Sequence, residues 1–294
     1  FEPLKENFEK GFLYYDAMTD DARLVISNAL QAKHYGAKIF THTPLISSQR
    51  TKENWQSQIL LNGVETRVTS KALINATGPW ASKLNQLLGL PKKDDLKLIK
   101  GSHIIIPALY HAKHAYILQN NDNRIIFTIP FLDKYTLVGT TDVNYMGTLE
   151  DVKISEDEKK YLLKLLSHYF TPTLKPSDIV SDYSGVRALI GENSIQAKNL
   201  NRDYKLELED SLAPVISVCG GKVTTFRVLG EQCINLLKPY FPGLKESLSQ
   251  KTKLPGGDID SLSKLNKIVM ETYPWLPKSI AERYCKNYGS RVFS

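Results

Sequence analysis

The first clear periodicity in the chain is that of an amphipathic helix near its N-terminal end. Apolar residues recur at intervals of three and four between Asp20 and Tyr35, which places them on one face of a helix. These residues are Ala22, Val25, Ile26, Ala29 and Leu30. Thr19 or Asp20 suits the N-cap, and Gly36 suits the C-terminal stop. The pattern therefore predicts a helix over residues 20–35.

Runs of β-branched and other apolar residues follow this helix and are separated by turn signals. We expect strands at 37–43, 55–61, 64–69 and 72–76. The second and third form a hairpin, because Asn62-Gly63 accepts the two positive φ angles of a two-residue turn. The fourth run is closed by Thr77-Gly78, as is typical of a buried strand that enters a tight turn. Pro79 then suits the first turn of a helix that ends at Gly89.

From Leu96 to Val143 the pattern changes to successive β-type runs that predict an antiparallel sheet. Its strands are expected at 98–107, 115–119, 124–130 and 135–139. Further strands are expected at 181–190, 204–208 and 214–218, and helices at 156–169, 224–237, 262–272 and 278–288. Helix-linked buried strands thus bracket an antiparallel block. This order indicates a fold class of α/β plus α+β, in which an α/β nucleotide-type layer is interrupted by an α+β layer.

Composition narrows the class of protein without identifying it. A chain of 294 residues with 42% hydrophobic and 23% charged residues is typical of one large or two ordinary globular domains. No apolar run approaches the roughly 18 residues of a membrane span, and no secretory pattern opens the sequence. Cys219, Cys233 and Cys285 are widely spaced, so neither a disulfide framework nor a metal site is expected.

The net charge of +7 is spread over lysines that alternate with acidic residues. A solvated basic surface accounts for this charge better than a nucleic-acid-binding stripe, because the signatures of DNA- and RNA-binding modules are missing. We therefore expect no nucleic-acid partner.

Two strand-to-turn junctions are candidates for ligand binding. The buried run that ends at Cys219 turns through Gly220-Gly221 into a helix from about Thr224. Glycines let a backbone approach a flat ligand closely, and a helix N-terminus favours negative charge such as that of a reduced flavin. The alternative is an ordinary turn in which the glycines serve only the backbone. The Thr77-Gly78 junction is open to the same two interpretations.

Seven motifs, in order along nearly the whole chain, resemble the FAD-dependent glycerol-3-phosphate dehydrogenases. They are DDARLV (20–25), NATGPW (75–80), KGSHIIIP (100–107), VGTTDV (138–143), YSGVRAL (183–189), NRDY (201–204) and GGKVTTF (220–226). The resemblance implies a D-amino-acid-oxidase-like FAD/substrate two-domain fold. It also implies oxidation of sn-glycerol 3-phosphate to dihydroxyacetone phosphate by hydride transfer to FAD, with electrons passed to a membrane quinone.

The same resemblance suggests a domain plan. Residues 14–92 and 210–243 would form part of the FAD-binding domain, residues 1–13 and 93–209 the substrate domain with its antiparallel sheet, and residues 244–294 the start of a C-terminal helical domain. The chain departs from the family in two places. Ala188 stands where the family usually has proline, and no G-x-G motif occurs anywhere. We therefore expect an N-terminally truncated fragment, with the missing loop upstream of Phe1 and with little FAD binding or turnover by the fragment alone.

The substrate implied by the resemblance needs cations for its phosphate and a proton acceptor for its hydroxyl. Arg187, Arg202 and Lys222 are the expected substrate-binding cations, and Gly185 beside Arg187 lets that arginine project into a cleft. Arg202 could equally form a local ion pair with Asp203. His103, Arg187 and Lys222 are the expected catalytic residues, since an imidazole titrates near neutrality and can take the hydroxyl proton.

The cofactor-binding residues expected from the resemblance lie at the two glycine turns. They are Thr77, Gly78, Gly220, Gly221, Lys222, Thr224 and Thr225. Hydroxyl residues at the start of a helix commonly cap it, so a capping role is the default for Thr224 and Thr225. Asp142 is expected to close a turn rather than to bind substrate.

Three alternatives remain open at this point. The parent protein could be another oxidase of the same fold that acts on an amino or 2-hydroxy acid, or the chain could be a silent anion-binding module. The basic charge could also reflect nucleic-acid binding, which would require steep salt dependence. For the leading interpretation we expect a cytoplasmic protein that is peripheral on the cytoplasmic membrane.

Overall fold

The computed structural model describes residues 3–91, 96–191 and 203–294. The chain folds into two compact units. The first comprises Phe1–Tyr14 and Ala72–Lys222, and the second comprises Tyr15–Lys71 and Val223–Ser294. This grouping follows contacts between residues and not ligand binding, so the domain plan of the sequence analysis stays a prediction.

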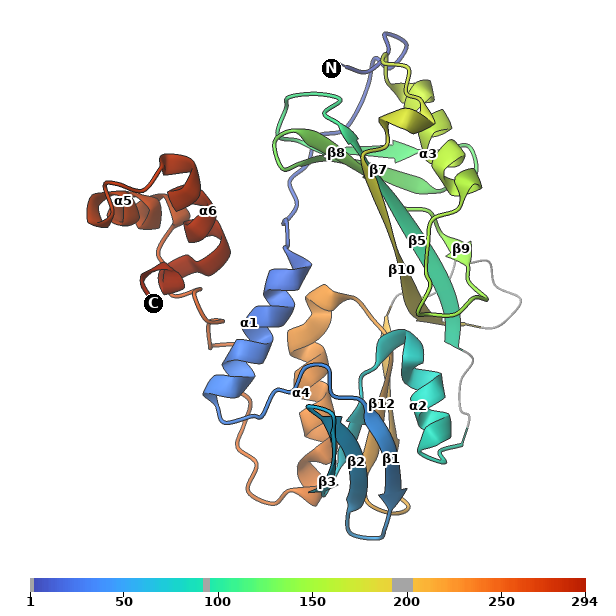
Figure 1. The fold of residues 1–294 in the computed structure, drawn as a ribbon, viewed down its shortest axis with the longest axis vertical. Helices are drawn as coiled ribbons and strands as arrows, with labels where there is room; N and C mark the ends of the chain where they lie inside the picture. The colour runs from blue at the N-terminus through green and yellow to red at the C-terminus, as the bar shows by residue number, and fades with distance from the viewer. Residues whose placement is uncertain (1–2, 92–95, 192–202) are drawn as a thin grey trace. The chain divides into compact units, whose positions relative to one another are not determined.

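A six-stranded antiparallel sheet dominates the first unit (Figure 1). Its strands are β5 (Leu96–Pro107), β6 (Tyr116–Gln119), β7 (Ile125–Phe131), β8 (Tyr135–Gly139), β9 (Val143–Asn144) and β10 (Ser181–Ile190). They lie in the order β10-β5-β8-β7-β6, and the short β9 pairs with β5. The antiparallel sheet predicted from the sequence is confirmed, because alternating apolar positions pack one face of the sheet while the other carries polar groups.

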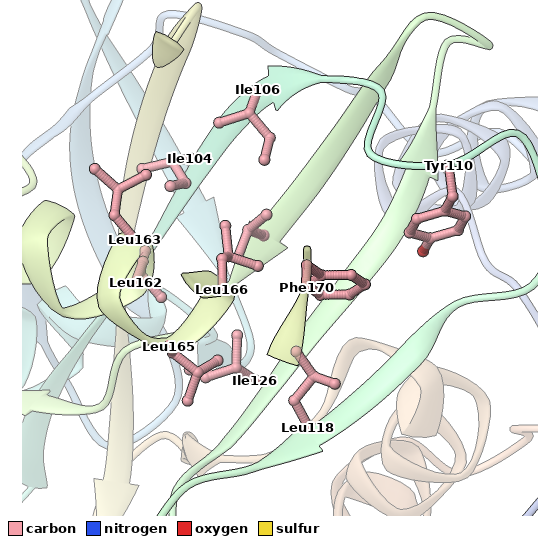
Figure 2. Packing of buried hydrophobic residues seen from close by; sticks show 11 residues of the cluster. Ile104, Ile106, Tyr110, Leu118, Ile126, Leu162, Leu163, Leu165, Leu166 and Phe170 are labelled. Atoms are coloured by element: carbon pink, nitrogen blue, oxygen red, sulfur yellow. The ribbon is translucent and has the colours of Figure 1, made fainter. Parts of the chain in front are cut away.

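Helix α3 (Glu156–Tyr169) covers one face of this sheet. It begins at a capping box formed by Ser155 and Glu158, as expected for an acidic first turn. Its leucines pack against alternate residues of β5, β7 and β6 to form a hydrophobic core (Figure 2). Ile104, Ile126, Leu162, Leu166 and Phe170 are fully buried there. This packing fixes which side of β5 faces α3 and which side faces away from it.

A second, three-stranded sheet in the same unit has the order β11-β12-β4. It consists of β4 (Leu73–Asn75), β11 (Tyr204–Glu209) and β12 (Val215–Gly220). β12 runs parallel to β4 and antiparallel to β11. Its first five residues are buried, which explains the continuous apolar run in the sequence. The turn after β4 forms η1 (Gly78–Trp80), which leads into α2 (Ala81–Leu87).

The second unit contains helices and a small hairpin sheet. Its elements are α1 (Asp21–His34), β1 (Leu45–Arg50), β2 (Trp55–Leu61), β3 (Val64–Ser70), α4 (Phe226–Leu237), α5 (Leu262–Thr272) and α6 (Lys278–Tyr288). Short 3-10 turns complete the chain at η2 (Pro176–Asp178), η4 (Val223–Thr225), η5 (Lys238–Tyr240) and η6 (Gly289–Phe293). Asn62 and Gly63 have φ of 51° and 80°, which confirms the predicted hairpin turn. No helix in the described ranges has both the length and the apolar character of a membrane span.

One predicted strand is wrong. Residues 37–43 form no strand, and the chain instead enters the sheet at β1. Ile39 and Phe40 are 46% and 50% exposed. The backbone N–H and C=O groups of a strand need a neighbouring strand as hydrogen-bond partner. Within the described residues the segment 37–43 pairs with no strand, whereas Leu45–Arg50 pairs with β2. Pairing therefore decided the strand position against local propensity.

Candidate active site

The face of the six-stranded sheet opposite α3 carries two of the predicted site residues, His103 and Arg187, together with Tyr183. In the pairing of β10 with β5, Tyr183 lies opposite His103 and Arg187 lies opposite Ile99. Because side chains alternate along a strand, Tyr183 and Arg187 share one face with His103. Ser102 and Ile104, the neighbours of His103, face α3 instead. We call the surface formed by His103, Tyr183 and Arg187 the His103 face.

His103 is held by its two strand neighbours. Its ring stacks on that of Tyr183 with centroids 4.8 Å apart and planes 8° apart. On the other side it faces Gly139 of β8, where an added Cβ would lie only 2.3 Å from His103 Cδ2. A glycine is therefore required at position 139 to admit the imidazole.

The electrostatic state of His103 follows from its surroundings. Burial, followed by the positive charge of Arg187, lowers the pKa of His103 from 6.5 to about 4. Its Nδ1 atom is buried and has no hydrogen-bond partner in the described part of the chain. Near neutral pH the imidazole is therefore uncharged, which is the form that can accept a proton.

Arg187 forms an ion pair with Asp142. The distance from Arg187 Nη2 to Asp142 Oδ1 is 2.8 Å, and the arginine side chain remains 37% exposed. The expected turn-closing role of Asp142 is thus replaced by contact with the candidate substrate cation. A side chain that is paired on one side and exposed on the other can still receive an anion.

A glycine also makes room for Arg187, but it is not the one suggested by the sequence. A Cβ at Gly185 would meet nothing within 4 Å, whereas a Cβ at Gly101 would lie 2.8 Å from Arg187 Nη2 and 2.5 Å from Thr140 Oγ1. Gly101 lies opposite Gly185 in the β5–β10 pairing. The close approach therefore depends on the β5 glycine, which belongs to the KGSHIIIP motif.

The two glycine turns meet at one edge of the small sheet. β4 and β12 are parallel neighbours, so their carboxyl ends lead side by side into Gly78 and Gly220-Gly221. These glycines have φ of 56°, 73° and 103°. In open α/β sheets, ligands bind at the carboxyl ends of parallel strands. The structure thus brings together the two junctions that the sequence singled out separately.

The glycines of the two turns differ in how much space surrounds them. A Cβ at Gly78 would meet nothing within 4 Å, so this turn leaves its backbone open to a ligand. A Cβ at Gly220 would lie 2.7 Å from the carbonyl oxygen of Asp203, and one at Gly221 would lie 3.1 Å from Tyr204 Cβ. The glycine pair is therefore already required by its packing against Asp203 and Tyr204, whether or not a flavin binds.

The buried side chain of Asn75 orders the first of these turns. Its Oδ1 accepts hydrogen bonds from Thr77 Oγ1 at 2.6 Å and Thr77 N at 3.2 Å, and its Nδ2 donates to Ala81 O at 2.9 Å. Asn85 Oδ1 accepts from both Asn75 Nδ2 and Ser217 Oγ, which ties α2 to β12. Both donors of Thr77 are thus directed into the protein, so a cofactor would contact Gly78 more readily than the Thr77 hydroxyl.

The remaining expected site residues are placed as follows. Lys222 is exposed directly after the glycine pair. Thr224 and Thr225 belong to the second unit, where Thr225 is the N-cap residue of α4 but its side chain makes no capping hydrogen bond. The default capping role is therefore wrong for Thr225. Arg202 lies outside the described residues. Within those residues no group of three or more metal-ligating side chains occurs.

Two residues that organise the site were missed in the sequence. Tyr183 has period-two spacing with Gly185 and Arg187, and this alternation was the available signal that it shares their face. Asn75 stands at the end of an apolar strand, where a polar side chain is a candidate for ordering the following turn. Their partners come from other strands and helices, so pairing had to be known first.

A titration measurement tests the electrostatics of the His103 face. We expect the imidazole signals of His103 in ¹H–¹⁵N NMR spectra to titrate near pH 4 and to stay those of a neutral ring from pH 6 to 8. In an Arg187→Met variant the midpoint should rise, because the positive charge is gone, but it should stay below 6.5, because burial is the larger cause. A His103 midpoint at or above 6.5 in the unsubstituted protein would contradict this account.

Comparison with known proteins shows the family to which this chain is similar. The model of the FAD dependent oxidoreductase family matches residues 1–226. A glycerol-3-phosphate dehydrogenase of Pseudomonas aeruginosa is 40% identical over 99% of this chain and 58% of its own length. A D-erythritol 1-phosphate dehydrogenase of Brucella abortus is 36% identical over 99% of this chain and 59% of its own.

A solved structure supports the same assignment at the level of fold. The glycerol-3-phosphate dehydrogenase from Bacillus halodurans, complexed with FAD, matches with a TM-score of 0.79 at 23% identity, over 94% of this chain and 55% of that one. The chain thus spans a little under three fifths of the length of these relatives. The likeness confirms the predicted D-amino-acid-oxidase-like fold, and the family match is independent of it. The chain belongs to the family of FAD-dependent oxidoreductases.

Proposed function

We propose that the full-length protein carrying this chain oxidises sn-glycerol 3-phosphate to dihydroxyacetone phosphate, with FAD as the hydride acceptor. The observation that carries the proposal is the His103 face, where a half-exposed arginine lies beside a neutral histidine on one side of the sheet. The names of the two curated relatives, which are both dehydrogenases of a polyol phosphate, point to the same substrate class.

Arg187 and His103 have different roles in this proposal. Arg187 binds an anionic oxygen of the substrate through the part of its guanidinium that Asp142 leaves exposed. His103 accepts the proton of the C2 hydroxyl while the hydrogen on C2 leaves as hydride. An anion bound to Arg187 offsets the positive charge that depresses the His103 pKa, so substrate binding would make the imidazole a stronger base.

The turns at the carboxyl ends of β4 and β12 are the proposed holders of the flavin, through Gly78, Gly220 and Gly221. The flavin, when bound, supplies a hydride acceptor. Lys222 follows the glycine pair, and its ammonium would favour a negatively charged ligand at this edge. Thr224 and Thr225 follow Lys222 along the chain and keep their proposed cofactor-binding role. Arg202 keeps its proposed role as a second substrate cation.

Steady-state turnover of the full-length, FAD-loaded protein tests the proposal. Glycerol 3-phosphate should be oxidised with a dye as electron acceptor, and glycerol, which lacks the phosphate, should react far more slowly. Oxidation of an amino or 2-hydroxy acid in preference to both would favour another oxidase of the same fold. No turnover with any of these substrates would overturn the proposal.

An FAD titration separates this proposal from that of a silent anion-binding module. The chain of 294 residues alone is mixed with FAD, and the shift of the flavin absorption bands is recorded. We expect weak binding or none by this chain alone, because no G-x-G loop is present to hold the pyrophosphate. Tight binding with a shifted spectrum would show that the chain carries a sufficient cofactor site.

The electron acceptor and cellular location belong to the same proposal. We take a membrane quinone as the acceptor and a cytoplasmic protein in peripheral contact with the membrane. The net charge of +7 suits an anionic leaflet, and the wide spacing of the three cysteines along the sequence fits a reducing compartment. Sedimentation of the full-length protein with anionic vesicles, compared with neutral vesicles at the same salt concentration, tests the membrane contact.

A further inference from the structure

A buried carboxylate lies behind the His103 face and takes no direct part in the proposed chemistry. Glu158, on the first turn of α3, is 7% exposed and accepts five hydrogen bonds. Its Oε1 accepts from Ser102 Oγ and Thr141 Oγ1, both at 2.8 Å. Its Oε2 accepts from Ser155 N at 2.8 Å, from Ser155 Oγ at 2.9 Å and from Lys100 Nζ at 2.7 Å. Burial alone would raise the pKa of Glu158, but these hydrogen bonds lower it to about 2, so the group is ionised at neutral pH.

Stability alone does not account for this arrangement. Replacing a buried ion pair with apolar groups of similar size is often neutral or stabilising, because desolvation offsets the attraction between the charges. The pair of Glu158 and Lys100 therefore calls for a reason other than helix packing, which the neighbouring leucines already supply. Its partners indicate the reason, since Thr141 belongs to the segment that leads to the candidate site.

Thr141 connects the carboxylate to the ion pair of the site. Its hydroxyl donates to Glu158 and accepts from Ser102 N at 2.9 Å, and the residue is fully buried. The next residue along the chain is Asp142, whose carboxylate binds Arg187 at 2.8 Å. On its other side the chain is paired with β5, where Val143 lies opposite Lys100. Asp142 thus lies between two anchored residues. Thr141 is held by Glu158, and Val143 is held by its pairing with β5.

We infer that Thr141, anchored on Glu158, is a positioning residue that holds Asp142 against Arg187 and so orients the guanidinium for an anionic substrate. The expected effect of Thr141 on kcat/KM rests on the proposed function, because that function gives Arg187 its substrate. The expected position of Asp142 does not rest on it, since Asp142 and Arg187 contact each other through the protein's own side chains.

Three substitutions test this inference in the full-length, FAD-loaded protein. Thr141→Val keeps the shape of the side chain and removes the hydroxyl, and we expect kcat/KM for glycerol 3-phosphate to fall about tenfold, mainly through a higher KM. Thr141→Ser restores the hydroxyl and should bring KM back to within about twofold of the unsubstituted value. Thr136→Val removes another buried threonine hydroxyl of the same sheet, which accepts from Leu109 N, and should leave KM unchanged.

A crystal structure of the Thr141→Val variant supplies a readout that needs no turnover. We expect the Asp142 carboxylate to have moved out of contact with Arg187 while α3 and β5 keep their places. An intact ion pair together with an unchanged KM would overturn the inference, and so would an equal rise in KM for Thr136→Val. If the unsubstituted protein fails to oxidise glycerol 3-phosphate, the proposed function fails, but the crystal structure still decides whether Thr141 positions Asp142.

Discussion

Replacing Arg187 with methionine is expected to lower kcat/KM for glycerol 3-phosphate by a factor of about 10²–10³, which corresponds to about 3–4 kcal/mol of lost transition-state stabilisation. Methionine keeps much of the length of the side chain but offers no charge and no donor, so the anionic substrate loses its partner on the His103 face. The measurement is steady-state turnover of the FAD-loaded protein with glycerol 3-phosphate and a dye acceptor.

The matched control for Arg187 is another ion-paired arginine of the same unit. Arg124 binds Asp122 at 2.6 Å and is 27% exposed, but it does not lie on β5 or β10. Arg124→Met should leave kcat/KM within about twofold, since a surface ion pair of this kind contributes little. An equal loss of kcat/KM in both variants would show that the effect comes from general electrostatics, which would contradict a specific role for Arg187.

The sequence predicted the elements of this fold wherever local periodicity and pairing agreed. The helix at 156–169 and the strands at 135–139 and 181–190 were predicted with the bounds that the structure has. The prediction of a strand at 37–43 was wrong for a physical reason. Residues with strand propensity form a strand only when another strand hydrogen-bonds to their backbone. Strand order within a sheet is likewise a property of long-range pairing, which no local pattern contains.

The candidate site was predictable as a set of residues but not as an arrangement. Motifs singled out His103 and Arg187, but their shared face follows from the register of β5 with β10. The pairing of Asp142 with Arg187 joins residues 45 positions apart, so the sequence favoured a local turn instead. Tyr183 and Thr141 carried no chemical signal of their own, because stacking and positioning depend entirely on neighbours from other elements.

Replacing Gly139 with alanine is the substitution that we expect to disturb the site most directly. The new Cβ would lie 2.3 Å from His103 Cδ2 and 2.7 Å from Cγ, so the imidazole must leave its place against Tyr183. Overpacking of this kind costs about 1–3 kcal/mol of unfolding free energy. A catalytic group displaced by about 1 Å can lose roughly 10²-fold in rate, and we expect kcat to fall by at least that factor.

The control for Gly139 is Gly185, which lies on the adjacent part of the sheet with nothing within 4 Å of an added Cβ. Neither glycine has the positive φ that alanine disfavours, so φ does not favour one substitution over the other. Gly185→Ala should therefore leave His103 in place, lower kcat less than Gly139→Ala does, and raise the unfolding free energy by about 0.5 kcal/mol, because alanine loses less backbone entropy in a strand. Urea denaturation and turnover of both variants give the comparison. Equal turnover in Gly139→Ala and Gly185→Ala would show that the position of His103 does not govern the reaction.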